Sequence, residues 1–375
     1  MPNKRISVCE PFLNGNETKY VMDAVSTGWI SSSGSYVTKF EEAFSGYCGV
    51  KHGVAVCNGT VALHLALAAL GIGKGDEVII PSFTMIATAF AVCYVGAMPV
   101  FVDADKDTWN IDVTKIEEKI TSRTKAIIPV HIFGNPCDMD AIVDIAKRHN
   151  LFIVEDAAEA HGATYHGHKV GSFSDIACFS FFANKNVTTG EGGMCVTDDE
   201  RYDDLLRYYK NVCFPTHGPR NYLHDDIGFN YRMSNIHAAI GLAQTEKADD
   251  YKKMRMTNHM LYKKHLADVS GIIFQKDEEE SENVGWMNTI IVDPDKYGRT
   301  SDELIAHLKD NNIDTRLLFK SMHVQPALKK YGCDCSGEYP VTDLLSENGF
   351  YLPSASNLNE EDIAHICGVI HEFAR

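Results

Sequence analysis

A lysine that follows an apolar run is the residue of this sequence best suited to chemistry. Lys185 comes directly after the stretch 179–184, and a glycine-rich turn over 190–193 follows it. Burying an ammonium group is costly, and burial lowers the pKa of the amine. Schiff-base chemistry needs such a neutral amine. Because a lysine can also bury its aliphatic stem and keep its head in water, Lys185 alone leaves both interpretations open.

Two further polar features stand where a strand is predicted to meet a helix. Asp156 follows the apolar run 152–154, upstream of the lysine. A carboxylate there could keep the ring nitrogen of bound pyridoxal phosphate protonated, or it could simply cap a helix. The tripeptide Asn58-Gly59-Thr60 opens an Ala- and Leu-rich stretch, where helix amides could bind a phosphate or form a plain cap. Taken together with Lys185, these features favour a pyridoxal-phosphate site over three unrelated structural roles.

The elements that must position these residues are predicted to be alternating strands and helices between about residues 50 and 200. Continuous apolar runs suit strands that are covered on both faces; they occupy 78–80, 99–102, 126–130, 151–154 and 177–181. Helical patterns lie between them at 61–70 and 138–149. Polar residues gather just past the carboxyl ends of the runs, where open α/β sheets bind ligands. The pattern predicts an α/β fold with a mainly parallel sheet.

The composition shifts after about residue 245. A charged helical stretch over 247–266 could link two domains, strands are expected near 286–292, and two helices begin with acidic residues after Ser301 and Asn359. A chain of 375 residues is long enough for two unequal domains. We therefore expect a large domain over 1–245 and a smaller α+β domain over 246–375.

The bulk composition argues against several classes of partner. The formal net charge is −16, from 35 Lys and Arg and 51 Asp and Glu, so phosphate backbones and anionic membranes are repelled. There is no apolar run of membrane-spanning length and no secretory signal at the start. We therefore expect a cytoplasmic protein that binds neither nucleic acid nor membrane. Cys333-x-Cys335 has no second pair at ligand spacing, so we expect a surface loop and no metal site.

Several motifs together resemble one known family along essentially the whole chain. The matching segments are 28–32, 58–64, 75–79, 155–160, 180–185, 190–193 and 230–233. They resemble the DegT/DnrJ/StrS sugar aminotransferases, which are fold-type I pyridoxal-phosphate enzymes. That resemblance implies a large domain with a mixed, mainly parallel sheet and a smaller α+β C-terminal domain. Within the family the sequence is most similar to the GDP-perosamine synthases, through 188–194, 228–233 and 238–244.

The resemblance implies transfer of an amino group from L-glutamate to C4 of a nucleotide-linked 4-keto-6-deoxy sugar. For perosamine synthases that sugar is GDP-4-keto-6-deoxy-D-mannose and the product is GDP-perosamine. A UDP- or dTDP-linked sugar, with its keto group at C4 or C3, is the alternative within the same fold. A sugar 3-dehydratase of the family would have a histidine in place of Lys185. A regulator without cofactor would not need Lys185, Asp156, Ser180 and Asn230.

The resemblance also implies roles for individual residues. Lys185 would bond to the cofactor and shuttle protons, Asp156 would pair with the ring nitrogen, and Glu159 would lie near the ring hydroxyl. Further cofactor contacts are implied at Gly59, Thr60, Met85, Ser180 and, from the neighbouring subunit, Asn230. Substrate contacts are expected at Arg220, His224, Arg232 and His323. A homodimer with shared active sites follows from the role of the Asn230 side chain.

Four positions depart from the family pattern, one of them Leu317, where the family often has proline after the arginine at Arg316. Met85 replaces the aromatic residue that usually stacks on the cofactor ring, although a thioether can also contact a π face. Leu223 stands where perosamine synthases have an aromatic residue, and Asn283 where they usually have a histidine. Apart from Met85, the positions that contact the cofactor match while those that face the sugar vary, so the cofactor is predicted more firmly than the sugar.

Overall fold

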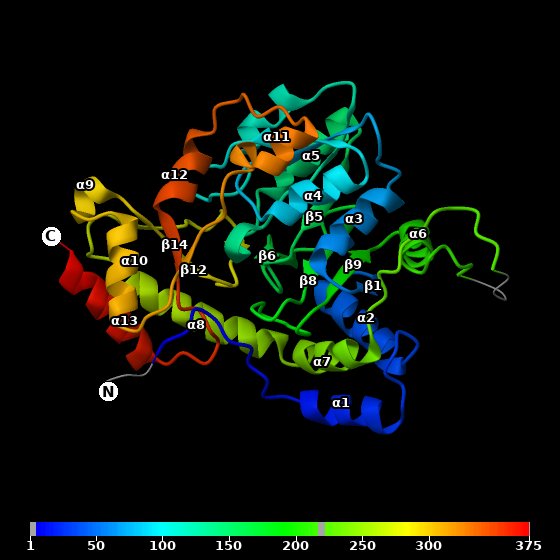
Figure 1. Ribbon diagram of the computed structural model, residues 1–375, viewed down its shortest axis with the longest axis horizontal. Coiled ribbons are helices and arrows are strands. Elements are labelled where there is room, and N and C mark those ends of the chain that lie inside the picture. Colours follow the sequence, from blue (N-terminus) through cyan, green and yellow to red (C-terminus); the bar gives the residue numbers. More distant parts are fainter. Residues whose placement is uncertain (1–4, 217–221, 375) are drawn as a thin grey trace.

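The computed structural model of the protein describes residues 5–216 and 222–374 (Figure 1). Its α-helices are α1 (Glu17–Ser26), α2 (Ser35–Cys48), α3 (Gly59–Ala69), α4 (Ile86–Tyr94), α5 (Met139–His149), α6 (Glu200–Lys210), α7 (Asn235–Thr245), α8 (Ala248–His265), α9 (Pro294–Tyr297), α10 (Ser301–Asp310), α11 (Pro326–Tyr331), α12 (Pro340–Asn348) and α13 (Glu360–Phe373). Its strands are β1 (His52–Val56), β2 (Glu77–Pro81), β3 (Met98–Val102), β4 (Thr124–Ile127), β5 (Phe152–Asp156), β6 (Thr164–Tyr165), β7 (His168–Lys169), β8 (Ile176–Ser180), β9 (Gly193–Thr197), β10 (Ile272–Phe274), β11 (Ser281–Glu282), β12 (Asn288–Val292), β13 (Arg316–Leu317) and β14 (Gly349–Leu352).

The central sheet has seven strands in the order β1-β9-β8-β5-β4-β2-β3. Strands β8, β5, β4, β2 and β3 pair in parallel, and β9 pairs antiparallel with both β8 and β1. This mixed, mainly parallel sheet confirms the predicted fold class. β4 ends at Ile127, short of the predicted run to Val130. Pro129 has no amide hydrogen to donate to a ladder, and Val130 continues only as an isolated bridge to Asp156.

Helices cover both faces of the central sheet because successive strand side chains point to opposite faces. Val78 and Ile80 of β2 lie in the core beneath α3 and α4, whereas Ile79 packs toward α5. On that second face Phe40 and Phe44 of α2 pack against β8 and β9, and α7 lies beside α2 (Figure 1). The strand that ends at Asp156 is therefore shielded from both sides.

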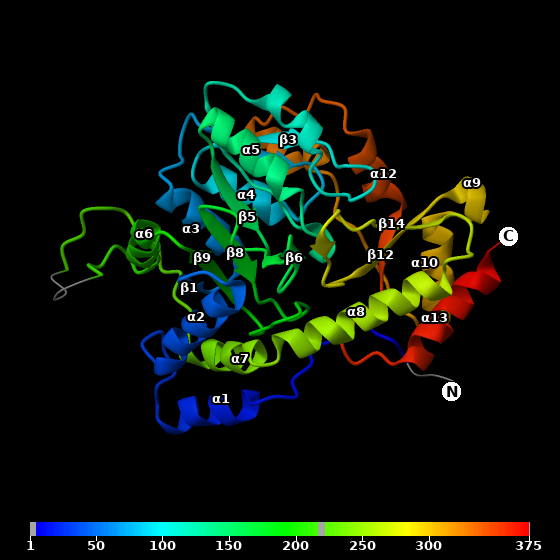
Figure 2. The ribbon, with the colours of Figure 1, turned by 180° about the vertical axis from the view of Figure 1, so that it is seen from behind.

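A second, four-stranded antiparallel sheet has the order β10-β12-β14-β13. Helices α8, α10 and α13 cover it and share a separate hydrophobic core with it. Figure 2 shows α8 running from α7 to this part of the molecule, where both ends of the chain also lie. Ile6 joins this core and forms a parallel bridge with Ile313. The boundary near residue 245 falls between α7 and α8 and stays a prediction.

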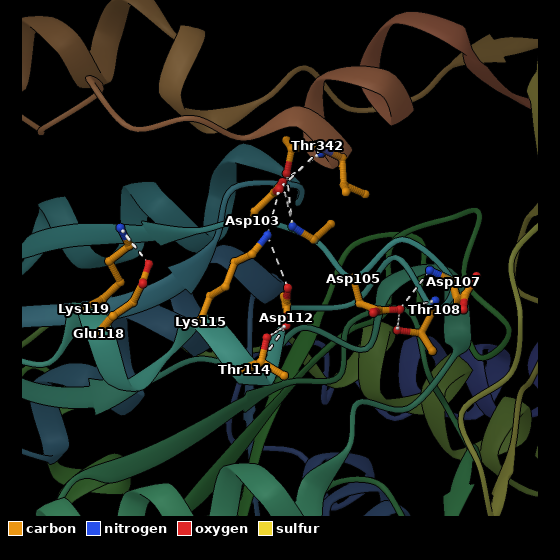
Figure 3. Close-up of polar contacts among 12 residues, drawn as sticks. Asp103, Asp105, Asp107, Thr108, Asp112, Thr114, Lys115, Glu118, Lys119 and Thr342 are labelled. Atoms are coloured by element: carbon orange, nitrogen blue, oxygen red, sulfur yellow. Dashed lines mark hydrogen bonds and ion pairs between the residues drawn. The ribbon is translucent and has the colours of Figure 1, made fainter.

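The C-terminal part of the chain is tied to the central sheet at the end of β3. Asp103 Oδ1 accepts a hydrogen bond of 2.9 Å from the Thr342 amide of α12, and Lys115 Nζ lies 3.3 Å from Asp103 Oδ2 (Figure 3). Cys333 is only 8% exposed and packs into the core around α3. The pair Cys333-x-Cys335 does lie in a loop, as predicted, and Asp334 and Ser336 there are exposed, but the Cys333 side chain itself is buried. In the described part of the chain no helix combines the length and apolar character needed to cross a membrane.

Candidate active site

A cavity of about 640 Å³ opens at the carboxyl ends of β5 and β8, beside the first turn of α3. Its walls come from seven separate parts of the chain, between residues 58 and 319. They are formed by Asn58, Gly59, Thr60, Val61, Leu63, Thr84, Met85, Ala87, Tyr94, Val130, Asp156, Ala158, Glu159, Ser180, Phe182, Asn184, Lys185, Glu191, Trp286 and Phe319. Every cofactor-binding residue predicted from sequence lies here except Asn230.

Lys185 reaches the cavity from the loop after β8, and its side chain is 10% exposed. Its Nζ lies 3.6 Å from the ring centroid of Trp286 and 3.9 Å from Glu159 Oε1. Burial lowers the pKa of the Lys185 amine, while the carboxylates of Glu159 and Asp156 oppose that shift. The lysine is thus held in a place that favours a neutral, nucleophilic amine.

Asp156 is the last residue of β5, where the strand's buried core ends at the cavity. Its Oδ2 accepts a 2.8 Å hydrogen bond from the Thr88 hydroxyl, and its Oδ1 accepts one of 3.3 Å from the Ala158 amide. Burial raises the pKa of Asp156, and the Thr88 hydrogen bond is the first of several influences that lower it. An oriented carboxylate at this point could pair with a protonated ring nitrogen.

Glu159 lies between the lysine and a strained turn. Phe133 has a left-handed backbone with φ of 57°, which is uncommon for a bulky residue. That conformation directs its amide to Glu159 Oε2 at 2.8 Å, so the other carboxylate oxygen faces Lys185. Burial raises the pKa of Glu159 to about 7, against the opposing effect of the Lys185 ammonium group. The carboxyl group can therefore take up or release a proton near neutral pH.

The opposite wall of the cavity is built for an anion. Asn58 caps α3 by accepting a 3.0 Å hydrogen bond from the Val61 amide. The amides of Gly59 and Thr60, in the first turn, have no acceptor within the helix. A side chain at position 59 would bring its Cβ within 2.6 Å of the Ser180 Cβ, so only glycine allows the helix to start so close to this serine. Amides, a hydroxyl and a helix N-terminus together suit a phosphate group.

These walls fit pyridoxal phosphate. The cofactor needs an amine to bond to, a carboxylate for its ring nitrogen and a cradle for its phosphate. Lys185, Asp156 and the start of α3 beside Ser180 offer these three groups around one cavity. Met85 also lines the cavity and is 45% exposed, and its sulfur accepts a 3.0 Å hydrogen bond from the Ala87 amide.

Several wall residues were not predicted from sequence, among them Trp286, Asn184, Thr84 and Phe319. Trp286 covers the Lys185 amine, and its indole nitrogen donates a 3.0 Å hydrogen bond to the Asn184 carbonyl oxygen. Thr84 and Phe319 also line the cavity. A tryptophan in an apolar stretch was the one available signal. No sequence signal marked Asn184 or Thr84 as a site residue, because the residues around them are typical of ordinary core and loop segments.

The predicted substrate residues do not line this cavity within one chain. Arg232 donates a 2.9 Å hydrogen bond to Asn230 Oδ1 and lines a smaller pocket with Arg207 and Lys210. The exposed His224 contacts the Val212 carbonyl oxygen at 2.8 Å. Arg220 lies outside the described residues.

His323 also lies away from the cavity. Its Nδ1 is 2.9 Å from the Ser82 hydroxyl, its Nε2 is 3.0 Å from Asp343 Oδ1, and its ring stacks on Tyr339. Both ring nitrogens are therefore engaged where the C-terminal segment packs on β2. This arrangement lends no support to a substrate contact by His323.

Comparisons with known proteins agree with this geometry. A model of the DegT/DnrJ/EryC1/StrS aminotransferase family matches residues 11–371. The chain is 45% identical over 371 residues to the GDP-perosamine synthase of Escherichia coli O157:H7, with 99% of each chain covered. It is 44% identical over 369 residues to the GDP-perosamine synthase of Caulobacter vibrioides, with 98% of each covered. The crystal structure of DesI with its TDP-sugar product matches with a TM-score of 0.90 and 31% identity, over 99% of this chain and 93% of that chain.

Proposed function

Because the chain belongs to the DegT/DnrJ/EryC1/StrS aminotransferase family, a family of pyridoxal-phosphate enzymes, we propose that it transfers an amino group from L-glutamate to a GDP-linked keto sugar. It takes the amino group of L-glutamate and places it on C4 of GDP-4-keto-6-deoxy-D-mannose, giving GDP-perosamine. The observation that carries the choice of sugar is full-length similarity to two proteins named GDP-perosamine synthase. The assigned chemistry rests on Lys185 and Asp156 facing one cavity.

Bound pyridoxal phosphate supplies a carbonyl that carries the amino group and a ring that accepts electrons. The residues of this chain supply the rest. Lys185 Nζ moves a proton between the cofactor and the carbon that loses or gains the amine. Asp156 holds a proton on the ring nitrogen, and Gly59, Thr60 and Ser180 hold the phosphate. Trp286 covers the lysine and keeps bulk water from its amine.

The charge of the cavity supports a homodimer with shared active sites. Among the residues that line the cavity, Lys185 is the one cation, whereas Asp156, Glu159 and Glu191 are acidic. Glutamate and a nucleotide diphosphate are both anions, so cations must come from elsewhere. We assign that task to Arg220, His224 and Arg232 of a second subunit, together with Asn230 for the phosphate. The enzyme would work in the cytoplasm.

A different nucleotide is the second candidate. DesI has a TDP-sugar product and shares this fold over nearly the whole chain. At Leu223 and Asn283 this chain departs from the perosamine-synthase pattern. Acceptance of a UDP- or dTDP-linked keto sugar is therefore the alternative to test.

The test is a comparison of kcat/KM for GDP-, UDP- and dTDP-linked 4-keto-6-deoxy sugars with saturating glutamate. The proposal predicts at least a tenfold preference for the GDP-linked sugar, about 1.4 kcal/mol of transition-state discrimination. The rate of the glutamate half-reaction serves as the control, because it precedes sugar binding. A preference for either other nucleotide would replace the proposed substrate.

A further inference from the structure

Two threonine hydroxyls form a chain of hydrogen bonds that ends on the Asp156 carboxylate. Thr88 belongs to the first turn of α4, and Thr84 precedes that helix. Their residues are 0% and 1% exposed. Thr88 Oγ1 donates to Asp156 Oδ2 at 2.8 Å, and the two threonine oxygens are 3.1 Å apart.

The direction of this chain follows from counting hydrogens. A hydroxyl has one hydrogen to donate. Thr88 gives its hydrogen to the Asp156 carboxylate, so the hydrogen shared by the two threonines comes from Thr84. A threonine in a helix commonly bonds instead to the carbonyl oxygen one turn earlier. Here Thr88 reaches a carboxylate on another element, which points to a role beyond helix stability.

The charges around Asp156 make this donor important. Burial disfavours the carboxylate form and raises the pKa of Asp156, whereas Thr88, the Ala158 amide, Lys185 and His131 oppose that effect. Lys185 is itself shifted toward its neutral form by burial. Glu159 is the other acidic group facing the lysine and adds negative charge when it ionises. The nearest fixed, uncharged donors to Asp156 are therefore Thr88 and the Ala158 amide.

We propose that Thr88 is a positioning residue that holds Asp156 ionised and oriented toward the cofactor's ring nitrogen, with Thr84 fixing the direction of the Thr88 hydroxyl. This inference rests on the assignment of Asp156 to the ring nitrogen. If the hydroxyl is lost, the carboxylate can rotate and takes up a proton more easily. The ring nitrogen then becomes less basic, because its partner no longer bears a fixed negative charge.

The experiment uses the full-length enzyme reconstituted with pyridoxal phosphate labelled with ¹⁵N in its ring. The ¹⁵N chemical shift reports whether the ring nitrogen is protonated, and it is followed between about pH 6 and 9. Thr88→Val removes the donor at nearly constant shape, and Thr88→Ser restores a hydroxyl. We expect Thr88→Val to lower the apparent pKa of the ring nitrogen by about one unit, a tenfold change in its protonation. Thr88→Ser should titrate like the wild type.

Two further variants, at Thr84 and Asp156, separate the role of the Thr88 hydroxyl from the roles of its two partners. Thr84→Val leaves the Thr88 donor in place, so we expect a smaller shift in the same direction. Asp156→Asn should abolish protonation of the ring nitrogen, and an unchanged ring in that variant would overturn the assignment of Asp156 itself. If Thr88→Val titrates like the wild type while Asp156→Asn does not, the role of Thr88 is wrong. A Thr88→Ser variant as impaired as Thr88→Val would show that packing, and not the hydroxyl, matters.

Discussion

At the scale of single residues, the pKa of the Lys185 amine is subject to two opposing effects. The Trp286 ring and the cavity wall desolvate its amine, whereas the Glu159 carboxylate lies 3.9 Å away. Glu159 is itself buried, so neither charge has water to stabilise it. Burial shifts both the Lys185 amine and the Glu159 carboxyl toward their neutral forms, which suits a lysine that must be neutral to attack.

Replacing Lys185 by alanine tests its covalent role. We expect transamination to fall by at least about a thousandfold, because both the nucleophile and the proton carrier are lost. The visible absorbance of the lysine-linked cofactor should disappear as well. Formation of 2-oxoglutarate and the absorbance spectrum are the two measurements. Lys296→Ala, on the exposed surface of α9, is the control. Turnover near the wild-type rate in Lys185→Ala would remove Lys185 from the mechanism.

Replacing Glu159 by glutamine tests its proton. The pKa of Glu159 is raised to about 7 from an ordinary value of 4.5. Between these values the folded state binds more protons than the unfolded state, so the unfolding free energy of the wild type falls as pH rises through this window. Glutamine does not titrate. We expect Glu159→Gln to gain stability relative to the wild type, on the order of 2 kcal/mol, between pH 5 and pH 8. Denaturant unfolding of the cofactor-free proteins measures this, and parallel pH profiles would contradict it.

Site residues whose chemical role is evident from the residue type could be predicted from the sequence. Asp156 ends β5 and Lys185 lies in the loop after β8, and the structure brings both to one cavity. Trp286 and Thr88 could not be predicted in the same way. Trp286 comes from the C-terminal part of the chain and reaches the site only through the packing of β12. Thr88 looks like any small residue in an apolar helix until Asp156 is placed beside it.

At the scale of elements, the start of α3 controls the phosphate end of the site. Gly59 there packs directly on Ser180. Gly59→Ala should weaken cofactor affinity at least tenfold, because the new methyl group would push α3 away from β8. Gly46 in α2 is the matched control, since a Cβ there meets nothing within 4 Å. Gly46→Ala should bind cofactor normally and gain about 0.5–1 kcal/mol in stability. Titration with pyridoxal phosphate and denaturant unfolding separate the two effects, and equal affinities would refute the packing argument.

Strand and helix positions were largely predictable from sequence because burial on both faces leaves a continuous apolar signal. β5 and β8 lie within one or two residues of their predicted runs. What the pattern could not give was the order of the strands or the folding back of residues 321–340 onto the sheet. His323 and Cys333 are buried for that reason. Their polar or loop-like sequence context said nothing of the long-range contact with β2 and α4.

At the scale of the whole molecule, the active-site cavity of a single chain has too few cationic residues for its anionic substrates. The net charge is −16, and Arg232 is held away from the cavity by Asn230 and Asn211. A second subunit that contributes Asn230 and nearby cations would resolve this, and it would leave each active site dependent on both chains.

Mixing two inactive variants tests the shared site. Lys185→Ala and Asn230→Ala should each be inactive as pure proteins. In a hybrid dimer one site receives both defects and the other is intact, so random exchange restores about a quarter of the sites. Activity assays and native mass spectrometry follow recovery and subunit exchange together. Exchange without recovered activity, or a fully active Asn230→Ala protein, would contradict the shared arrangement.

The central claim is that this cavity moves the nitrogen of glutamate to C4 of a GDP-linked keto sugar. Its most direct test is to incubate the enzyme with ¹⁵N-labelled L-glutamate and GDP-4-keto-6-deoxy-D-mannose, and to locate the label by NMR. We predict one ¹⁵N bonded to C4 of the sugar in GDP-perosamine, with 2-oxoglutarate formed in equal amount and no product from Lys185→Ala. Label at another carbon, or a GDP-linked sugar that leaves the reaction unlabelled, would contradict the account.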